Sequence, residues 1–411
     1  MQIFVAIKAC QNILENMTSD MHQDRELYAS ELKNMLKEAL QNAIEGEFSA
    51  HPGDPYFYTQ KAYSMQTEIE GLPLYPQEIP DVLLNWAKLD KEKTRRKEDI
   101  LVLDLETTGL GRTGTLAFMI GLGYYENNQF IVEQLFLPDP EAEVSSFDRL
   151  LELVKSRSLL ITFNGKTFDV PVLESRLLYH QIWLNLREME HLDLLHIARR
   201  LWRNKLPSCA LETIEFYVLG HIRDKELDIE GGDIPQTYYQ FLLNGDPELI
   251  RRVFIHNHHD ILHTAALFTL IADSISYPPA HGFDIRIDYH ALARLYQSQG
   301  EEETSRRILV DLMAAGVVTA DVMRDLGLIY KKAKELDSAL ECFQIASDLN
   351  CPDSMLELCM LLEKNNKEYA KALACAEKLK NWHLSRYIVN SKRIAELDKR
   401  MERLKRLTER R

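Results

Sequence analysis

Hydrophobic residues first occur in short dense runs along the chain and later follow a helical spacing. Apolar runs of strand length cover residues 100–105, 115–123, 130–137 and 159–163, with turn-forming residues between them. Short links between the first three runs predict an antiparallel meander, and the fourth run predicts a further strand. Helical spacing predicts helices at Ser145–Lys155, Val170–His180, Asp193–Leu201, Cys209–Leu219, Gln236–Leu243 and Asp246–Ile275. The pattern indicates a mixed α/β layered domain over residues 99–278, with helices flanking the sheet.

From residue 287 onward, the pattern of hydrophobic positions repeats along the chain. Leu292, Leu295 and Tyr296 recur 34 residues later as Leu326, Ile329 and Tyr330. This period is typical of tetratricopeptide-like helix pairs, which predicts an all-helical repeat region over residues 287–390. A plain helical bundle is the alternative. Residues 391–411 predict a basic amphipathic helical tail.

The first 98 residues predict a helical and irregular lead-in. Helical spacing covers residues up to about 50, and proline-rich turn chemistry predicts an irregular segment over residues 51–98. That segment ends in the basic cluster Lys91, Lys93, Arg95, Arg96 and Lys97. The cluster is either a solvated linker or a contact for phosphates.

Charge and composition exclude some classes of protein. The net charge of −14 and the pI of about 5.5 argue against a general nucleic-acid coat and a membrane-surface protein, since both would be basic. The six cysteines form no C-x-x-C pair and indicate reduced, buried thiols. With no signal-peptide pattern and no apolar run of membrane-span length, a cytoplasmic protein is expected.

Two acids mark the end of the first predicted strand. Side chains alternate along a strand, so Asp104 and Glu106 project to the same face. Paired carboxylates repel one another and are costly to desolvate, unless a hard cation such as Mg²⁺ or Mn²⁺ lies between them. The alternative is a strand end at which both acids reach water.

Two more acids lie on neighbouring predicted elements. Asp169 follows the fourth strand at the head of a helix, with Pro171 well placed in the first turn. Asp260 lies within the long helix Asp246–Ile275, four residues after His256, so that both side chains share one helical face. A mid-helix aspartate among apolar neighbours is poorly explained by a role in the core.

Two other motifs permit rival interpretations. Gly109–Gly114 matches G-x-G-x-x-G after a strand, but a strand-like run follows where a dinucleotide site needs a helix, so a hairpin turn is the better explanation. His256, His259 and His263 recur at helical spacing and permit a zinc site, although no H-E-x-x-H motif occurs. More simply, His258, His259 and His263 are polar neighbours or surface residues.

Taken together, the motifs resemble a known family. Asp104-Leu-Glu106, then Asn164–Asp169, then His256 and Asp260 are similar to the three motifs of ribonuclease H-like 3′–5′ exonucleases with four acidic residues, the DnaQ/DEDD superfamily. Residues 112–123 and 191–195 resemble its YprB-like subgroup. The resemblance covers about residues 99–275.

The resemblance implies a two-metal phosphodiesterase. Asp104, Glu106, Asp169 and Asp260 would hold two Mg²⁺ or Mn²⁺ ions, which activate water and stabilise the leaving 3′-oxygen. One branch of the superfamily has a histidine five residues before the last aspartate, and another has a tyrosine four residues before it. Here His256 has the residue type of one branch and the spacing of the other. It either acts as general base or orients the attacking water, or it only supports the site or contacts the substrate while a metal-bound hydroxide suffices.

Substrate contacts are expected near the first two motifs. Backbone N–H groups at Thr107 and Thr108 are expected to bind a terminal nucleotide. Asn164 and Lys166 are expected to bind phosphate, and Phe168 to pack on a base or sugar, with a place in the core as its alternative.

The leading hypothesis is a metal-dependent 3′–5′ exonuclease that acts on single-stranded or frayed ends of DNA or RNA. A structure-specific endonuclease lies within the same chemistry. The alternative is a nucleic-acid-binding scaffold protein with weak or no turnover, whose repeats recruit a protein partner.

Overall fold

The computed structural model describes residues 33–51, 54–109, 111, 114–276, 282–388 and 390–409. The chain divides into two compact units, one containing the residues up to Arg199 together with Leu206–Pro279. The other contains Arg200–Lys205 and Ala280–Arg411. Within the described ranges, every helix is too short or too polar to cross a lipid bilayer. Of the predicted N-terminal helix, residues 33–43 are helical and residues 1–32 lie outside the described ranges.

The first unit is built on a seven-stranded mixed sheet. The predicted meander is confirmed, because β5, β6 and β7 pair antiparallel in sequence order. Strands β8 and β9 continue the sheet parallel to β5, and β2 and β1 continue it beyond β7. The strand order is β1 (Glu47–Phe48), β2 (Phe57–Ser64), β7 (Gln129–Phe136), β6 (Ala117–Glu126), β5 (Ile100–Thr107), β8 (Leu159–Thr162) and β9 (Glu190–Asp193).

The prediction of an irregular segment over residues 51–98 is wrong for β2. This strand pairs with β7 along its whole length, from Phe57 opposite Phe136 to Ser64 opposite Gln129. Most of its side chains are exposed or half-buried, so the strand lacks the apolar alternation that marks the others. The same segment also contains the hairpin of β3 (Glu68–Ile69) and β4 (Leu72–Pro73), and helix α3 (Asp81–Ala87).

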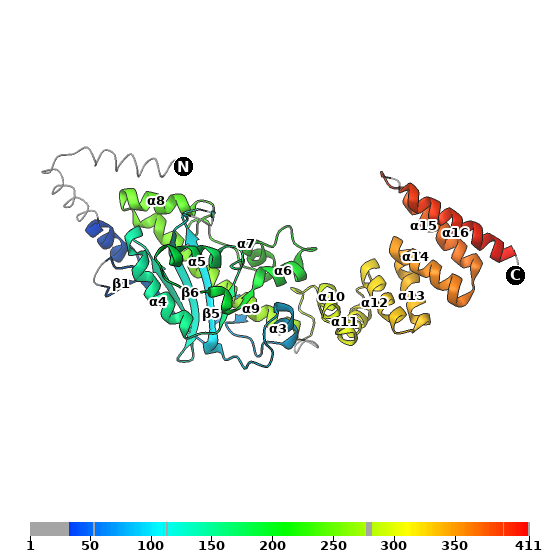
Figure 1. Ribbon diagram of the computed structural model, residues 1–411, viewed down its shortest axis with the longest axis horizontal. Helices are drawn as coiled ribbons and strands as arrows, with labels where there is room; N and C mark the ends of the chain where they lie inside the picture. Colours follow the sequence, from blue (N-terminus) through cyan, green and yellow to red (C-terminus); the bar gives the residue numbers. More distant parts are fainter. Residues whose placement is uncertain are drawn as a thin grey trace. The chain divides into compact units, whose positions relative to one another are not determined.

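Helices cover both faces of the sheet (Figure 1). On one face, Leu101, Leu103 and Leu105 of β5 share a core with α4 (Glu143–Lys155) and α5 (Asp169–Tyr179). On the opposite face, Phe118 of β6 and Phe136 of β7 share a core with α8 (Ile234–Asn244) and α9 (Pro247–Ile275). Because strand side chains alternate, the positions between the three leucines face α9.

Helix α9 lies close to β6 because two glycines of that strand have no side chain. A Cβ atom built on Gly121 would lie 2.4 Å from Oδ1 of Asn257, and one on Gly123 would lie 2.7 Å from Cγ2 of Ile261. These distances are shorter than atoms tolerate, so any larger residue would push α9 outward. The helix begins at Pro247, and the Asp246 side chain accepts a hydrogen bond from the Glu248 N–H at 3.0 Å, which caps it.

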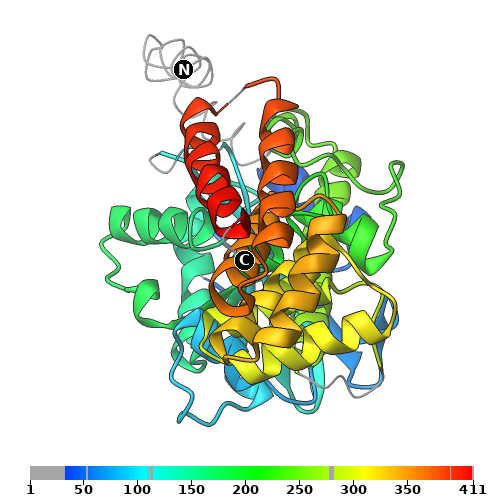
Figure 2. The ribbon, with the colours of Figure 1, turned by 90° about the vertical axis from the view of Figure 1, so that its right-hand side faces the viewer.

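The C-terminal unit is all-helical from residue 289, as predicted. Helices α10, α12 and α14 begin at Tyr289, Ala320 and Pro352, so successive pairs start 31 and 32 residues apart. Gly327 provides room for Phe343 of the next helix, and these two helices lie side by side in Figure 2. The helices are α10 (Tyr289–Ser298), α11 (Glu302–Ala314), α12 (Ala320–Lys332), α13 (Leu336–Asp348), α14 (Pro352–Leu361), α15 (Tyr369–Leu384) and α16 (Ser391–Glu409).

Candidate active site

The four predicted acids and His256 converge around the end of β5. Oxygen or nitrogen atoms of Glu106, His256 and Asp260 lie within 4.8 Å of one another. The Leu105 N–H, between the two acids of β5, donates to Oδ1 of Asp169 at 3.1 Å, which ties the start of α5 to this strand. Burial, and then the charges of the other three acids, raise the pKa of Asp104. Elements far apart in sequence therefore form one acidic centre.

Electrostatics at this centre favour bound cations. Burial, followed by the charge of Asp260, raises the pKa of Asp104 and of Glu106 well above their ordinary values. Burial also raises the pKa of Asp169 to about 7 and raises the pKa of Asp260, although His256 and Arg223 oppose the latter shift. Neighbouring carboxylates repel one another when they are ionised, and a bound cation stabilises the ionised form by neutralising this charge. Hard oxygen ligands of this kind suit Mg²⁺ and Mn²⁺.

A buried amide holds Asp104 in place. Nδ2 of Asn257 on α9 donates to Oδ2 of Asp104 at 2.9 Å, across the space that Gly121 leaves open. Gln134 of β7 donates in turn to Oδ1 of Asn257 at 3.0 Å, and it accepts from Thr59 of β2 at 2.9 Å. Asn257 is fully buried. Sequence reasoning missed it, because nothing in the sequence of α9 distinguishes it from the other polar residues of that helix.

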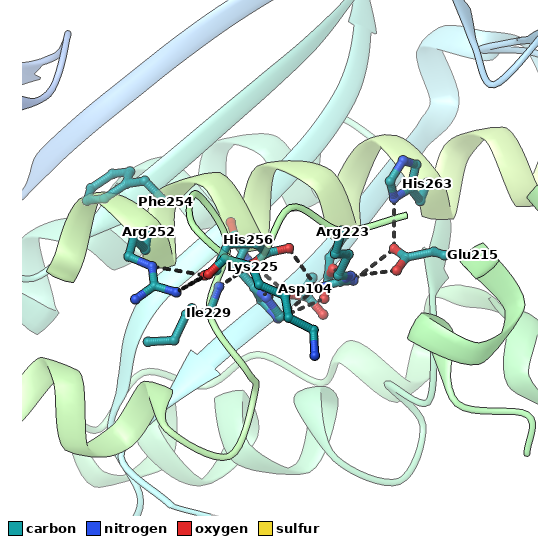
Figure 3. A network of polar contacts seen from close by, with 12 residues as sticks. Asp104, Glu215, Arg223, Lys225, Ile229, Arg252, Phe254, His256 and His263 are labelled. Carbon is teal, nitrogen blue, oxygen red and sulfur yellow. Dashed lines mark hydrogen bonds and ion pairs between the residues drawn. The ribbon is translucent and has the colours of Figure 1, made fainter. Parts of the chain in front are cut away.

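Arg223 was also missed, and it lies inside the acidic centre (Figure 3). Its Nη2 donates to Oδ1 of Asp260 at 2.5 Å and to Oε1 of Glu215 at 2.8 Å, while its Nε donates to Oε2 of Glu215 at 2.6 Å. Glu215 is fully buried, so this paired carboxylate fixes the guanidinium beside Asp260. No pattern in the sequence marks a loop arginine for this place.

His256 is held from two sides. Its Nδ1 lies 2.8 Å from Oδ1 of Asp228 and 2.8 Å from Nη1 of Arg223. A ring nitrogen carries either a proton or a lone pair, so Nδ1 serves one of these partners at a time. Its Nε2 faces Oδ2 of Asp260 at 3.6 Å. Burial lowers the pKa of His256, but Asp260 and Asp228 outweigh it and leave the pKa raised.

The threonines after β5 are occupied by the turn that follows. Oγ1 of Thr107 donates to the Gly109 carbonyl at 2.8 Å. The Thr108 N–H donates to the Leu116 carbonyl at 3.0 Å, and Oγ1 of Thr108 accepts from the Leu116 N–H at 3.0 Å. The Thr108 N–H is thus already paired within the turn, and the expected donation from Thr107 and Thr108 to a nucleotide stays a prediction.

The turn from β8 to α5 contains the three other expected substrate contacts. Backbone N–H groups of Asn164 and Lys166 donate to the buried carboxylate of Asp193 at 2.8 and 3.0 Å, which shapes the turn ahead of Asp169. The Lys166 side chain is exposed and accessible to a phosphate. Phe168 is half-buried against the core of the α4 and α5 face, as its alternative interpretation predicts.

Neither rival motif forms, among the described residues, the site that its sequence pattern predicts. Strand β6, and not a helix, follows the glycine-rich turn, although residues 110, 112 and 113 lie outside the described ranges. The zinc site that includes His256 is not formed, because this ring faces Asp228 while Nδ1 of His263 lies 2.7 Å from Oε1 of Glu215.

A cavity of about 1020 Å³ opens beside the acidic centre. Its wall combines aromatic, basic and acidic side chains from the segment before α8 and from α9. The members relevant to a ligand are Phe216, Tyr217, Arg223, Lys225, Arg252, His256 and Asp260.

Comparisons with known proteins found a family, a relative and a solved structure. Residues 101–272 match the RNase H superfamily. The chain is 31% identical over 312 residues to the uncharacterized protein YprB of Bacillus subtilis (strain 168), across 73% of this chain and 75% of that protein. Its structure has a TM-score of 0.33 and 13% identity with the family B DNA polymerase of Pyrobaculum calidifontis, over 58% of this chain and 29% of the polymerase.

Proposed function

Since the chain belongs to the YprB family, with a domain of the RNase H superfamily, we propose that it is a metal-dependent 3′–5′ exonuclease acting on DNA or RNA. The observation that carries the proposal is the convergence of four acids from β5, α5 and α9, of which Glu106 and Asp169 are buried and Asp104 and Asp260 are half-buried. A structural role does not require these acids together, because burying several carboxylates side by side is costly. The 3′–5′ direction rests on the resemblance of the three motifs.

The donor set fits two hard divalent cations. Asp104, Glu106, Asp169 and Asp260 would hold Mg²⁺ or Mn²⁺, which would supply an activated water and a charge that stabilises the leaving 3′-oxygen. The residues of the chain contribute positioning. Asn257 orients Asp104, and the Leu105 N–H orients Asp169.

The position of His256 allows it to accept or donate a proton at the acidic centre. Asp228 holds its Nδ1, so its Nε2 faces the acidic centre beside Asp260. This arrangement suits a general base or a group that orients the attacking water. Beside it, the cavity offers exposed Phe216 and Tyr217 for base stacking and Lys225 for a phosphate.

The test is the release of mononucleotides from single-stranded DNA and RNA, labelled at the 5′ end, with Mn²⁺ or Mg²⁺. The 3′–5′ exonuclease should shorten the strands stepwise from a free 3′ end and leave circular strands intact. Asp104→Asn and Asp260→Asn should abolish this release. Glu248→Gln, which changes an exposed acid of the same α9, is the matched control and should keep full activity.

Other outcomes separate the alternatives. Cleavage of circular strands would indicate an endonuclease, and unchanged rates in the two aspartate variants would refute the assigned site. Binding of single strands without turnover, together with no Mn²⁺ binding by calorimetry, would favour a scaffold. Recruitment of a partner by the helical repeats stays a prediction.

A further inference from the structure

A second cluster of metal-binding side chains lies on α9 outside the acidic centre. Potential ligand atoms of Glu70, His221 and His263 lie within 4.8 Å of one another. The ring of His259 lies beside this group, with its centroid 5.5 Å from that of His221 and 5.7 Å from that of His263. The rings of His221 and His263 are 4.3 Å apart. Three imidazoles and a carboxylate therefore gather from a hairpin, a loop and a helix.

The nitrogens that a metal needs are available in this cluster. Among the described residues, Nε2 of His221 and Nδ1 of His259 are buried and have no hydrogen-bond partner. A buried polar atom without a partner is costly, so native proteins rarely retain one without a reason. Two such atoms on adjacent imidazoles, next to a third ring, point to a metal ion that accepts a lone pair from each ring.

The other nitrogens of two rings are held by carboxylates. Nδ1 of His221 lies 2.8 Å from Oε1 of Glu70, and Nδ1 of His263 lies 2.7 Å from Oε1 of the fully buried Glu215. Histidines that bind metals typically donate one N–H to a carboxylate, which fixes the tautomer and presents the other nitrogen to the ion. Nε2 is the presented nitrogen in both rings.

The backbone places His221 for this purpose. A π-helical turn, Glu215–Leu219, follows α7 (Leu211–Ile214) and ends at Gly220, which has a left-handed φ of 80°. The His221 N–H then donates to the Glu215 carbonyl at 2.9 Å, which caps this turn and brings the imidazole against α9. Single π-helical turns within helices occur frequently at functional sites.

We propose that His221, His259 and His263, with Glu70 as a fourth ligand or as the partner of His221, bind one divalent transition metal, with Zn²⁺ the best match. Imidazole nitrogens suit Zn²⁺, whereas the carboxylates of the acidic centre suit Mg²⁺ and Mn²⁺. The two sites therefore differ in the metal that they select. Glu215 connects them, because it accepts from both His263 and Arg223.

Full-length protein, dialysed against a chelator and then loaded with Co²⁺ as a probe, tests the site without any assay of nuclease activity. Four-coordinate Co²⁺ absorbs strongly in the visible range, and Zn²⁺ should displace it. Wild type should bind one such ion. Asp104→Asn should keep the visible band, although it loses Mn²⁺ binding at the acidic centre.

The histidine variants decide the outcome. The double variant His221→Asn, His263→Asn should lose the band, whereas His258→Asn, whose ring hydrogen-bonds to Tyr63 and lies on the same helix, should keep it. Glu70→Gln changes an exposed hairpin residue, so it should fold normally and weaken Zn²⁺ binding by about 10–100-fold. An unchanged band in the double variant, or unchanged affinity in a folded Glu70→Gln protein, would overturn the proposal.

Discussion

The guanidinium of Arg223 donates to the carboxylate of Asp260 at 2.5 Å, within a centre of four buried or half-buried acids. Arg223 thus places a positive charge on the same carboxylate that a divalent cation would bind. Its side chain is 13% exposed, and Glu215 holds it through two further hydrogen bonds. Cation binding and the Arg223 contact therefore act on the same charge balance.

Replacing this arginine should destabilise the protein most when divalent cations are absent. Arg223→Met leaves Asp260 and Glu215 without their shared cation, and breaking a buried ion pair costs about 3–5 kcal/mol. Chemical denaturation with a chelator should show this loss, and Mn²⁺ should restore part of it. Arg251→Met, which removes an exposed ion pair on α9, should cost less than about 1 kcal/mol. Equal losses in the two variants would show that Arg223 does not balance the acids.

Gly121 should tolerate no side chain. In Gly121→Ala, the new Cβ would overlap Asn257, so the amide would move away from Asp104. The expected cost is about 1–3 kcal/mol of folding free energy, with weaker Mn²⁺ binding in calorimetry. Gly232→Ala is the matched control, since nothing lies within 4 Å of its added Cβ. Wild-type metal affinity in Gly121→Ala would mean that Asn257 does not orient Asp104.

The pH dependence of nuclease activity should report on His256. Burial lowers the pKa of this imidazole, but Asp260 and Asp228 outweigh burial, so the pKa is raised overall. As a catalytic base, His256 would therefore be deprotonated only at a pH above the ordinary pKa of histidine. The acid limb of kcat/KM should therefore have a midpoint above about 6.5. Asp228→Asn removes one acid that stabilises the imidazolium, and should move that midpoint to lower pH. A midpoint that stays fixed would exclude His256 as the base.

Folding stability should fall in mild acid because of His191 on β9. Burial first, and then Lys166 and His196, lower the pKa of His191 to about 3. Its ring hydrogen-bonds to Oγ1 of Thr162 at 2.8 Å. Below about pH 6.5, His191 binds a proton in the unfolded chain but not in the folded protein. The contribution of His191 to folding stability is therefore full above about pH 6.5 and is lost as the pH falls toward 3.

Thermal unfolding between pH 7 and pH 4 measures this effect. His191→Gln keeps a group that can bond to Thr162 but does not titrate, so its stability should fall less steeply, by about 1–3 kcal/mol over the range. His196→Gln changes an exposed histidine nearby and should follow wild type. Parallel curves for all three proteins would mean that His191 is accessible to protons in the folded state.

Sequence reasoning succeeded where a residue's role is visible in its own neighbourhood. Strands β5 to β8 and the long α9 are marked by dense apolar runs and helical spacing, and the paired acids of β5 stand out against such a run. The convergence of Asp104, Glu106, Asp169 and Asp260 followed from their order along a familiar set of elements.

The remainder depends on contacts between distant segments. Arg223 sits in a loop with no periodicity, and only the folded chain shows that Glu215 directs it to Asp260. Asn257 could not be distinguished from other polar residues of α9 without the close approach at Gly121. Strand β2 was missed because an outer strand buries few side chains, so its apolar alternation is weak.

That outer strand has a practical consequence for anyone who prepares the RNase H-superfamily domain alone. A fragment that begins near residue 99, where the recognisable motifs start, would lack β2 and leave the backbone of β7 unpaired along eight residues. Exposed, apolar strand edges template pairing between molecules. Such a fragment should aggregate, whereas one that begins before residue 47 would keep its edge covered.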